Sequence, residues 1–153
     1  MSGLRHRAKD IATHVMSSVH RTILKLSGGR LLGRPFGMPA VELHTIGRKS
    51  GAARTTMLAS PVHDDRRVVL VASKGGDDRD PDWYLNAMAH PEVDVTIDGA
   101  TRHLRARTAS PGERAELWPQ IVAAYKGYDG YQRKTERPIP VVICEPVDER
   151  PSV

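Results

Sequence analysis

A basic amphipathic helix is predicted near the start of the chain. Over residues 11–26 apolar side chains recur every three or four positions, so a helix would gather them on one face. The opposite face carries histidines, serines and cations, and Gly28-Gly29 ends the helix. Such an apolar stripe either packs on its own domain, lies on an anionic membrane or contacts a partner protein.

After a Gly- and Pro-rich loop the apolar period changes to two, which predicts β-strands. The strands are expected at residues 41–46, 55–62, 68–73, 93–97, 102–108 and 139–145. The short connections between them predict hairpins, and therefore mainly antiparallel pairing. Six short strands with few helices favour a small barrel closed on itself, because closure removes exposed sheet edges.

Two further helices interrupt the strands, so the predicted class is α+β. Asp80 is expected to cap the first helix, which ends near residue 90. Ser110 and Glu113 have the spacing of a capping box and open the second helix, which continues to about residue 125.

The length of 153 residues fits a single globular domain. Residues 1–35 carry seven Lys or Arg and one acidic residue, whereas residues 36–153 are nearly neutral. The sequence therefore predicts a basic amphipathic arm, residues 1–35, ahead of a folded domain, residues 36–153. Because the cations do not alternate with aromatics over the domain, we expect no nucleic-acid partner.

Other classes of protein are disfavoured by what the sequence lacks. The sequence contains neither an apolar run long enough for a membrane span nor a signal-peptide pattern, so we expect a cytoplasmic protein. The seven histidines include no His-x-x-x-His pair, and the single cysteine completes no ligand set, so no metal site is expected. Gly-x-Ser-x-Gly is also absent, which disfavours a hydrolase triad.

The turn at residues 47–54 has the composition of an anion-binding loop. Glycines flank three cations and a hydroxyl between two predicted strands. Cations and exposed backbone N–H groups suit a phosphate or a carboxylate, although a solvated loop is the alternative. The candidate residues are Arg48, Lys49, Ser50, Gly51 and Arg54.

A second candidate segment joins a strand end to the start of a helix. A lysine and two glycines allow a backbone to approach a ligand closely, and an indole and an amide follow. This combination suits a flat aromatic cofactor with an anionic tail, while the alternative places Trp83 in the core. The candidate residues are Ala72, Ser73, Lys74, Gly75, Gly76, Trp83, Tyr84, Leu85 and Asn86.

Three tyrosines recur at every third position just after the last predicted helix: Tyr125, Tyr128 and Tyr131. Phenols interleaved with glycines commonly line a pocket or an interface, and one of them is available to donate a hydrogen bond to a substrate oxygen. The alternative is that all three simply pack with satisfied hydroxyls.

Taken together, these segments resemble the deazaflavin-dependent nitroreductase family of actinobacteria, also called F420H2-dependent quinone reductases. The resemblance covers about residues 38–146 and rests on GRKSGAAR, VASKGG, DPDWYLNAMAHPEV, GERAELWPQ, YQRKTER and IPVVICEP. It implies a split β-barrel related to flavin-binding oxidoreductases, with coenzyme F420, an 8-hydroxy-5-deazaflavin with a phosphate and an oligoglutamate tail, as cofactor.

The resemblance also implies roles for individual residues. Residues 48–51 and Arg54 would hold the cofactor phosphate, and residues 72–76 and 83–86 would flank its ring system. Tyr128 and Ser73 would be the catalytic residues, with Tyr125 and Tyr131 lining the substrate mouth. The implied reaction is hydride transfer from the reduced deazaflavin to a quinone, or to a nitroaromatic acceptor.

Two positions depart from the family member that reduces bicyclic nitroimidazoles. This chain has Ala59 and Lys134 where that protein has aromatic residues, so its acceptor pocket is differently shaped. The alternative functions are an FMN-dependent oxidoreductase of the same fold and a non-catalytic, membrane-docked deazaflavin-binding module. Residues 1–35 are expected to dock the protein on the inner face of the cell membrane, where a lipid-soluble quinone resides.

Overall fold

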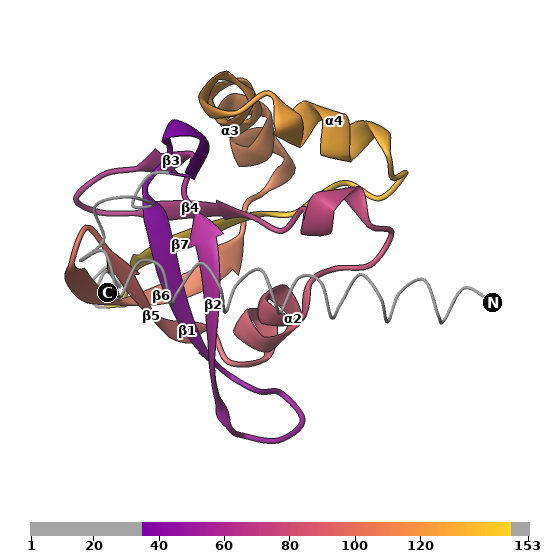
Figure 1. Ribbon diagram of the computed structural model, residues 1–153. Helices are drawn as coiled ribbons and strands as arrows, with labels where there is room; N and C mark the ends of the chain where they lie inside the picture. Colours follow the sequence, from indigo (N-terminus) through magenta and orange to yellow (C-terminus); the bar gives the residue numbers. More distant parts are fainter. Residues whose placement is uncertain (1–34, 148–153) are drawn as a thin grey trace.

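A computed structural model describes residues 35–147 of the chain (Figure 1). The predicted amphipathic helix at residues 11–26 lies outside the described residues. The described elements, in chain order, are η1 (Pro35–Gly37), β1 (Ala40–Ile46), β2 (Ala53–Ala59), β3 (Val62–His63), β4 (Val68–Val71), η2 (Lys74–Gly76), α2 (Asp82–Ala89), β5 (Glu92–Ile97), β6 (Ala100–Thr108), α3 (Pro111–Ala124), α4 (Gly127–Arg133) and β7 (Val141–Pro146).

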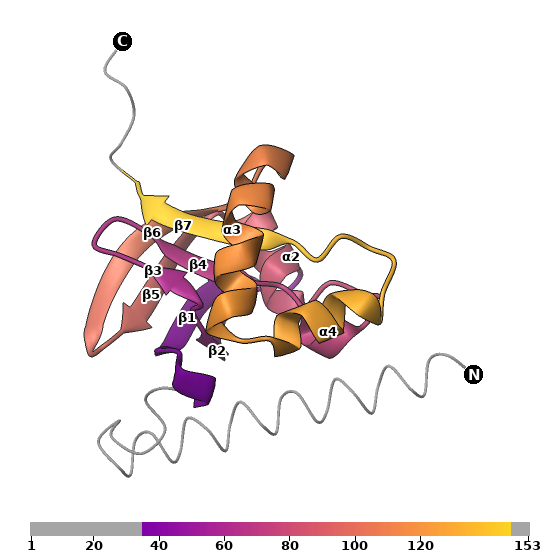
Figure 2. The same ribbon diagram turned by 90° about the horizontal axis from the view of Figure 1, so that it is seen from above.

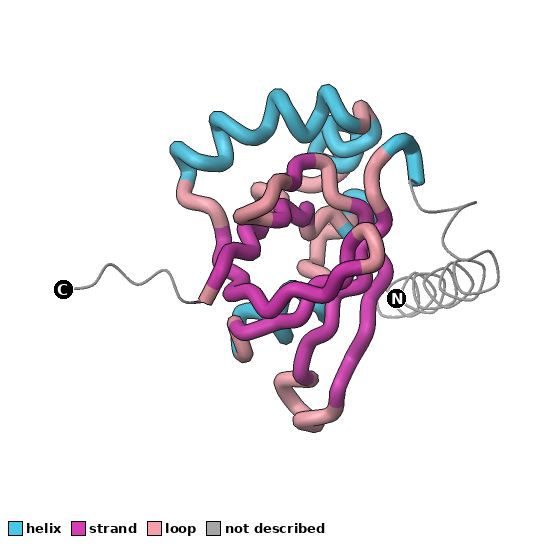
Figure 3. Tube along the Cα trace, turned by 90° about the vertical axis from the view of Figure 1, so that its left-hand side faces the viewer, coloured by secondary structure: helices cyan, strands magenta, loops and turns pink. Residues whose placement is uncertain are grey.

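All seven strands belong to one sheet with the order β2-β1-β5-β6-β7-β4-β3. Every pair of neighbours in this sheet is antiparallel. The sheet curls around on itself, as the view in Figure 3 shows. The predicted α+β class and the mainly antiparallel pairing are therefore confirmed.

The sheet does not close, so the predicted closed barrel is wrong. Among the described residues no ladder joins the edge strands β2 and β3. These two strands are consecutive in the chain and are separated only by Ser60 and Pro61, so the predicted strand at 55–62 is divided. Proline has no backbone N–H to give to a ladder, and β3 is only two residues long. The two edges are thus linked by the chain and not by paired strands.

Ser60 holds this junction together. Its backbone N–H donates to the carbonyl of Pro39 at 3.1 Å, which extends the β1–β2 ladder by one bond. Its hydroxyl lies 2.9 Å from the carbonyl oxygen of Val62 and 2.8 Å from that of Val69, which share its hydrogen. Ser60 is only 1% exposed, so these contacts form away from water. One serine therefore ties the β1–β2 end of the sheet to the β3–β4 end.

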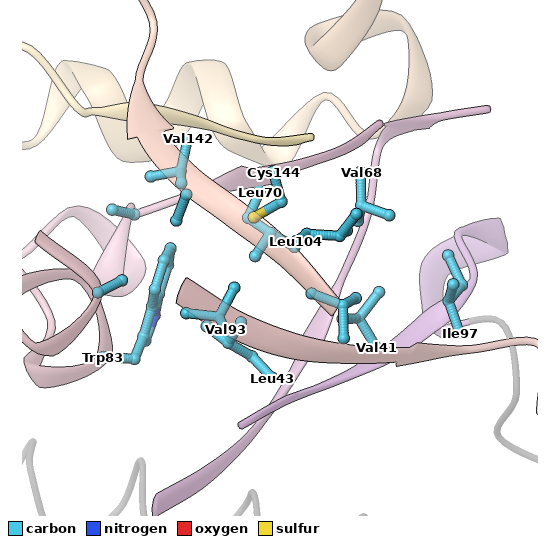
Figure 4. Close-up of a cluster of buried hydrophobic side chains, with 14 residues drawn as sticks. Val41, Leu43, Val68, Leu70, Trp83, Val93, Ile97, Leu104, Val142 and Cys144 are labelled. Carbon is cyan, nitrogen blue, oxygen red and sulfur yellow. The ribbon is translucent and has the colours of Figure 1, made fainter. Parts of the chain in front are cut away.

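Two hydrophobic clusters lie on opposite faces of the sheet. The inner cluster fills the inside of the curl and includes Val68, Leu70, Val142 and Cys144 (Figure 4). The outer cluster alternates with it along the same strands and includes Val69, Val71, Val141 and Ile143. The strands β4 and β7 are consequently buried on both faces, which explains why their sequences read as unbroken apolar runs. Burial also raises the pKa of the Cys144 thiol to about 12, so the thiol stays protonated.

The helix α3 covers the outer cluster and begins as predicted. The Ser110–Glu113 capping box is present, with Glu113 accepting from the backbone N–H of Ser110. Arg107 on β6 makes a bidentate ion pair with Glu113 at 2.7 and 2.8 Å, which lowers the pKa of that carboxyl to about 2. The same arginine also donates to Glu145 on β7. The start of α3 is therefore fastened to two strands.

Two helix predictions need correction. The N-cap of α2 is Pro81, and Asp80 instead accepts a hydrogen bond from Arg137. The helix α4 was not predicted, because Gly127 and Gly130 lower its intrinsic helix propensity. Packing of its tyrosines on the outer cluster stabilises it.

None of the helices within residues 35–147 has the length and apolar character of a membrane span. Figure 2 shows α3 and α4 together over one face of the sheet.

Removing the hydroxyl of Ser60 is expected to destabilise the fold. In Ser60→Ala the carbonyls of Val62 and Val69 lose their shared buried donor, which costs about 1–3 kcal/mol of the free energy of unfolding. Urea denaturation measures this difference. The control is Ser50→Ala, since that hydroxyl lies in an exposed turn and its loss costs within about 0.5 kcal/mol. Equal stability of the two variants would contradict the role given to Ser60.

Candidate functional site

The β1–β2 hairpin turn is attached to α2 through Arg48. Both the backbone N–H and the Nη1 of Arg48 donate to the Oδ1 of Asn86, at 3.1 and 2.8 Å. The Nη2 lies 3.3 Å from the Oδ1 of Asp82, and the Arg48 side chain is 26% exposed. Arg48 is thus largely occupied within the protein, where it fixes the turn on the helix.

Residues 49–54 of the turn are exposed to solvent, whereas Gly47 is buried. A Cβ at Gly47 would lie 2.7 Å from the Oγ of Ser50, so the Ser50 side chain would have to move to accommodate it. Lys49 and Arg54 are exposed and make no ion pair with any residue of the 35–147 segment. Gly51 has a φ of +71° with open space around it, and the Oγ of Ser50 accepts from the N–H of Ala52. The turn therefore presents two cations whose charge is not neutralised locally.

The loop after β4 has an unusual backbone. Lys74, Gly75 and Gly76 all have positive φ, at +45°, +63° and +86°. A Cβ on Gly76 would lie 2.7 Å from the carbonyl oxygen of Tyr131 and 2.9 Å from the Cβ of Lys134, so only glycine lets η2 pack on α4. A Cβ on Gly75 would meet nothing within 4 Å. Gly76 is fixed by packing, whereas Gly75 faces open space.

Ser73 stands at the start of this loop and is 9% exposed. Its carbonyl accepts from the N–H of Gly76 at 2.9 Å and from the Nη2 of Arg137 at 3.1 Å. Its hydroxyl has no hydrogen-bond partner in the part of the chain that the structure describes. The hydroxyl is therefore available to a ligand. Ala72 beside it is fully buried in the inner cluster.

The three tyrosines form an aromatic group around α4. Their ring centroids lie 5.4 Å apart for Tyr125–Tyr128, 6.3 Å for Tyr125–Tyr131 and 6.2 Å for Tyr128–Tyr131, all edge to face. Phe36 stacks on Tyr125 at 4.5 Å and is itself 71% exposed. Gly127 is needed here, because a Cβ would lie 2.3 Å from the ring of Tyr125.

The pKa values of the Tyr128 and Tyr131 hydroxyls are raised by their surroundings. Tyr128 is 7% exposed, and this burial raises the pKa of its hydroxyl far above the usual value. Among residues 35–147, that hydroxyl donates only to the sulfur of Met38, a weak acceptor, at 3.8 Å. The hydrogen bond between Tyr131 and Tyr125, with partial burial, raises the pKa of Tyr131 to about 12. These groups can donate hydrogen bonds, but they do not act as bases near neutral pH.

The predicted residues of α2 point in different directions. Trp83 is 7% exposed and its indole lies in the inner cluster (Figure 4). Tyr84 packs edge to face on Trp83, and its hydroxyl bonds to the Oγ1 of Thr108 at 2.8 Å. Leu85 is half-buried, and Asn86 holds Arg48. Trp83 and Asn86 therefore serve first to build the scaffold.

Figure 1 shows how these segments are arranged on one side of the molecule, with the β1–β2 turn at the bottom, α2 and η2 above it and α4 at the top. Two connections are direct: Arg48 with Asn86, and Gly76 with Tyr131 and Lys134. Within residues 35–147, no hydrogen bond, ion pair or ring contact joins the turn at 47–52 to the tyrosines. The site thus consists of a cationic end and an aromatic end.

Sequence reasoning missed the residues that hold these segments in place. Arg137, between α4 and β7, donates to carbonyls of the loop after β4, and Gln132 binds the backbone that carries Arg137. Both lie within the motif YQRKTER. The only signal for them was a charged and an amide side chain just before an apolar strand, which does not reveal partners some sixty positions away. No group of three or more metal-ligating side chains exists in the described part of the chain.

The chain is similar to proteins of known family. The family model described as F420H(2)-dependent quinone reductase matches residues 16–146. An F420H(2)-dependent quinone reductase of Mycobacterium tuberculosis is 38% identical over 130 residues, which is 82% of this chain and 86% of that protein.

Two solved structures are also similar. An F420-H2 dependent reductase, FDR-A, is 41% identical, covers 70% of this chain and 94% of its own, and superposes with a TM-score of 0.64. A domain-swapped dimer is 34% identical, covers 94% of this chain and 98% of its own, and has a TM-score of 0.66.

Proposed function

The chain belongs to the F420H(2)-dependent quinone reductase family, and we propose from this membership that it reduces a quinone with F420H2. The observation that carries the proposal is the family match over residues 16–146, which includes every segment of the candidate site. Coenzyme F420 is accordingly the cofactor, and the enzyme is an oxidoreductase. Bound F420H2 supplies a hydride from its deazaflavin ring.

The residues present fit such a cofactor. Lys49 and Arg54 are exposed cations without an ion-pair partner in the described segment, which suits a phosphate and an oligoglutamate tail. The open space at Gly75 lets a planar ring approach the backbone. The hydrogen bond between Arg48 and Asn86 holds the cationic turn in place. Trp83 and Ala72, at the start of the loop after β4, belong to the same inner cluster. We assign the curled, open sheet to the split barrel, since its edges meet only at Ser60 and Pro61.

We assign the aromatic end of the site to binding of the quinone that accepts the hydride. Tyr128 and Ser73 each present a hydroxyl with no strong acceptor inside the described protein, so either is free to donate to an acceptor oxygen as it gains negative charge. The raised pKa of Tyr128 makes it a hydrogen-bond donor and a poor proton relay. Tyr125 and Tyr131 line the approach of the acceptor, and the Nζ of Lys134 lies 5.8 Å from the ring centroid of Tyr131.

The function is tested by titrating the purified protein with oxidised F420 and, separately, with FMN. F420 is expected to bind far more tightly, and Lys49→Ala is expected to weaken it by about 1.5–3 kcal/mol because one charged contact is lost. Arg66→Ala, which removes an exposed cation from the β3–β4 turn, is the matched control and leaves the affinity unchanged. Tighter binding of FMN would establish the flavin-dependent alternative. Binding of F420H2 without oxidation by any quinone would indicate a non-catalytic binding module.

Tyr128→Phe tests the hydrogen-bond donor. The substitution deletes one hydroxyl whose only partner in the described part of the chain is a thioether, so the fold and the cofactor affinity stay close to those of the parent. We expect kcat for quinone reduction to fall by about tenfold or more, because a donor to the developing oxyanion is lost. Thr101→Val, which removes an exposed hydroxyl on β6 that bonds to the Oγ1 of Thr96, is the control and keeps the activity of the parent. Unchanged turnover in Tyr128→Phe would contradict this role, and Ser73 would then be the hydrogen-bond donor to the acceptor oxygen.

The basic arm, residues 1–35, is proposed to dock the domain, residues 36–153, on the anionic inner face of the cell membrane. Its seven cations and predicted apolar stripe would act together there, so binding should weaken in salt without vanishing. Co-sedimentation with anionic and neutral vesicles compares the full chain with one that begins at Leu32. Equal sedimentation of the two chains would refute the docking.

A further inference from the structure

The guanidinium of Arg137 is directed at the loop after β4. Its Nε donates to the carbonyl of Asp77 at 2.8 Å, and its Nη2 donates to the carbonyls of Ala72 and Ser73 at 3.3 and 3.1 Å. Its Nη1 makes an ion pair with the Oδ1 of Asp80 at 3.0 Å. The side chain is only 15% exposed. Arg137 thus donates hydrogen bonds to three backbone carbonyls and one carboxylate within residues 72–80.

These contacts stabilise a backbone conformation of the loop that is unfavourable by itself. Lys74 has a left-handed φ of +45°, which is unfavourable for a residue with a side chain, and Gly75 and Gly76 continue with positive φ. With Ser73 in the right-handed region, the pair Ser73–Lys74 has the conformation in which successive N–H groups converge to bind an electron-rich atom. The N–H groups of Ser73 and Gly75 donate to nothing within residues 35–147.

Arg137 is itself held from the other side. The Nε2 of Gln132 on α4 donates to its carbonyl at 2.8 Å, and its own N–H donates to the Oγ1 of Thr135 at 3.3 Å. The Oε1 of Gln132 accepts from Arg114 on α3 and from the N–H of Ile139. The segment between α4 and β7 is therefore anchored before its arginine reaches the loop.

We propose that Arg137 is a positioning residue for the cofactor. It turns the carbonyls of residues 72, 73 and 77 toward itself and so keeps the N–H groups of Ser73 and Gly75 free for the electron-rich edge of the deazaflavin ring. Arg137 does not touch the ligand; it acts through the loop. The inference rests on the proposed function and adds a residue that determines cofactor affinity.

The test substitutes Arg137→Lys, which keeps the charge but loses the planar fork that reaches several acceptors at once. The dissociation constant of oxidised F420 is expected to rise by about tenfold, which corresponds to about 1.4 kcal/mol. The KM for F420H2 should rise likewise, while the KM for the quinone stays near that of the parent. Amide hydrogen exchange should become faster at Gly76 and Asp77, whose N–H groups donate to the carbonyls of Ser73 and Lys74, because the loop opens more often.

Arg107→Lys is the matched control. Arg107 also binds several acceptors at once, on Glu113 and Glu145, but contacts no residue of the loop. The variant Arg107→Lys should have a lower thermal stability than the parent but the same F420 affinity and the same exchange rates at Gly76 and Asp77. A purely structural role for Arg137 would make the two lysine variants alike in affinity, and that result would overturn the proposal.

Two other results of these experiments can be told apart from a failure of the proposed role of Arg137. If the parent protein binds no F420, the proposed function fails, and the exchange rates of Gly76 and Asp77 still test whether Arg137 holds the loop. If Arg137→Lys does not fold, Asp80→Ala removes the carboxylate that holds Nη1 and should give a smaller loss of F420 affinity in the same direction. Parent-like affinity in Asp80→Ala would then overturn the proposal.

Discussion

The architecture depends on the two residues that join the edges of the sheet. Because β2 and β3 are the outermost strands and only Ser60 and Pro61 separate them, a flat sheet is impossible for this chain. The sheet must curl until its ends meet, and the shared hydrogen of the Ser60 hydroxyl holds them there without a ladder. The curl encloses the inner cluster, and Trp83 from α2 packs into that cluster. The position of α2, and with it the anchoring of the cationic turn, follows from this junction.

The candidate site shows a division between side chains that build it and side chains that face outward. Arg48 and Arg137 carry full charges but are engaged by protein acceptors, so they fix backbone segments in place. Lys49, Arg54 and the hydroxyl of Ser73 have no such engagement among residues 35–147. A pre-formed loop with free donors binds a ligand without first having to become ordered, which reduces the entropic cost of association.

The sequence predicted correctly those features that depend on residues close to one another along the chain. The Ser110–Glu113 capping box lies within one helical turn and was predicted correctly, as were the apolar alternation of the strands and the hairpins between them. The helix α4 was missed because its stability comes from Tyr128 packing on strands distant in sequence, against the propensity of its glycines. The role of Arg137 was missed for the same reason, since its acceptors lie about sixty residues away. For the same reason Asp80 was taken for a helix cap, whereas it is a partner of that arginine.

The strands β4 and β7 form a wall common to both hydrophobic clusters. Their even and odd positions belong to different clusters, so a shift of either strand disturbs the inside of the curl and the layer beneath α3 and α4 at once. The helical cover that carries the tyrosines cannot detach as an independent unit while the curled sheet persists. Residues 35–147 are therefore expected to fold as one cooperative unit, in which the cationic end and the aromatic end of the site are gained or lost together.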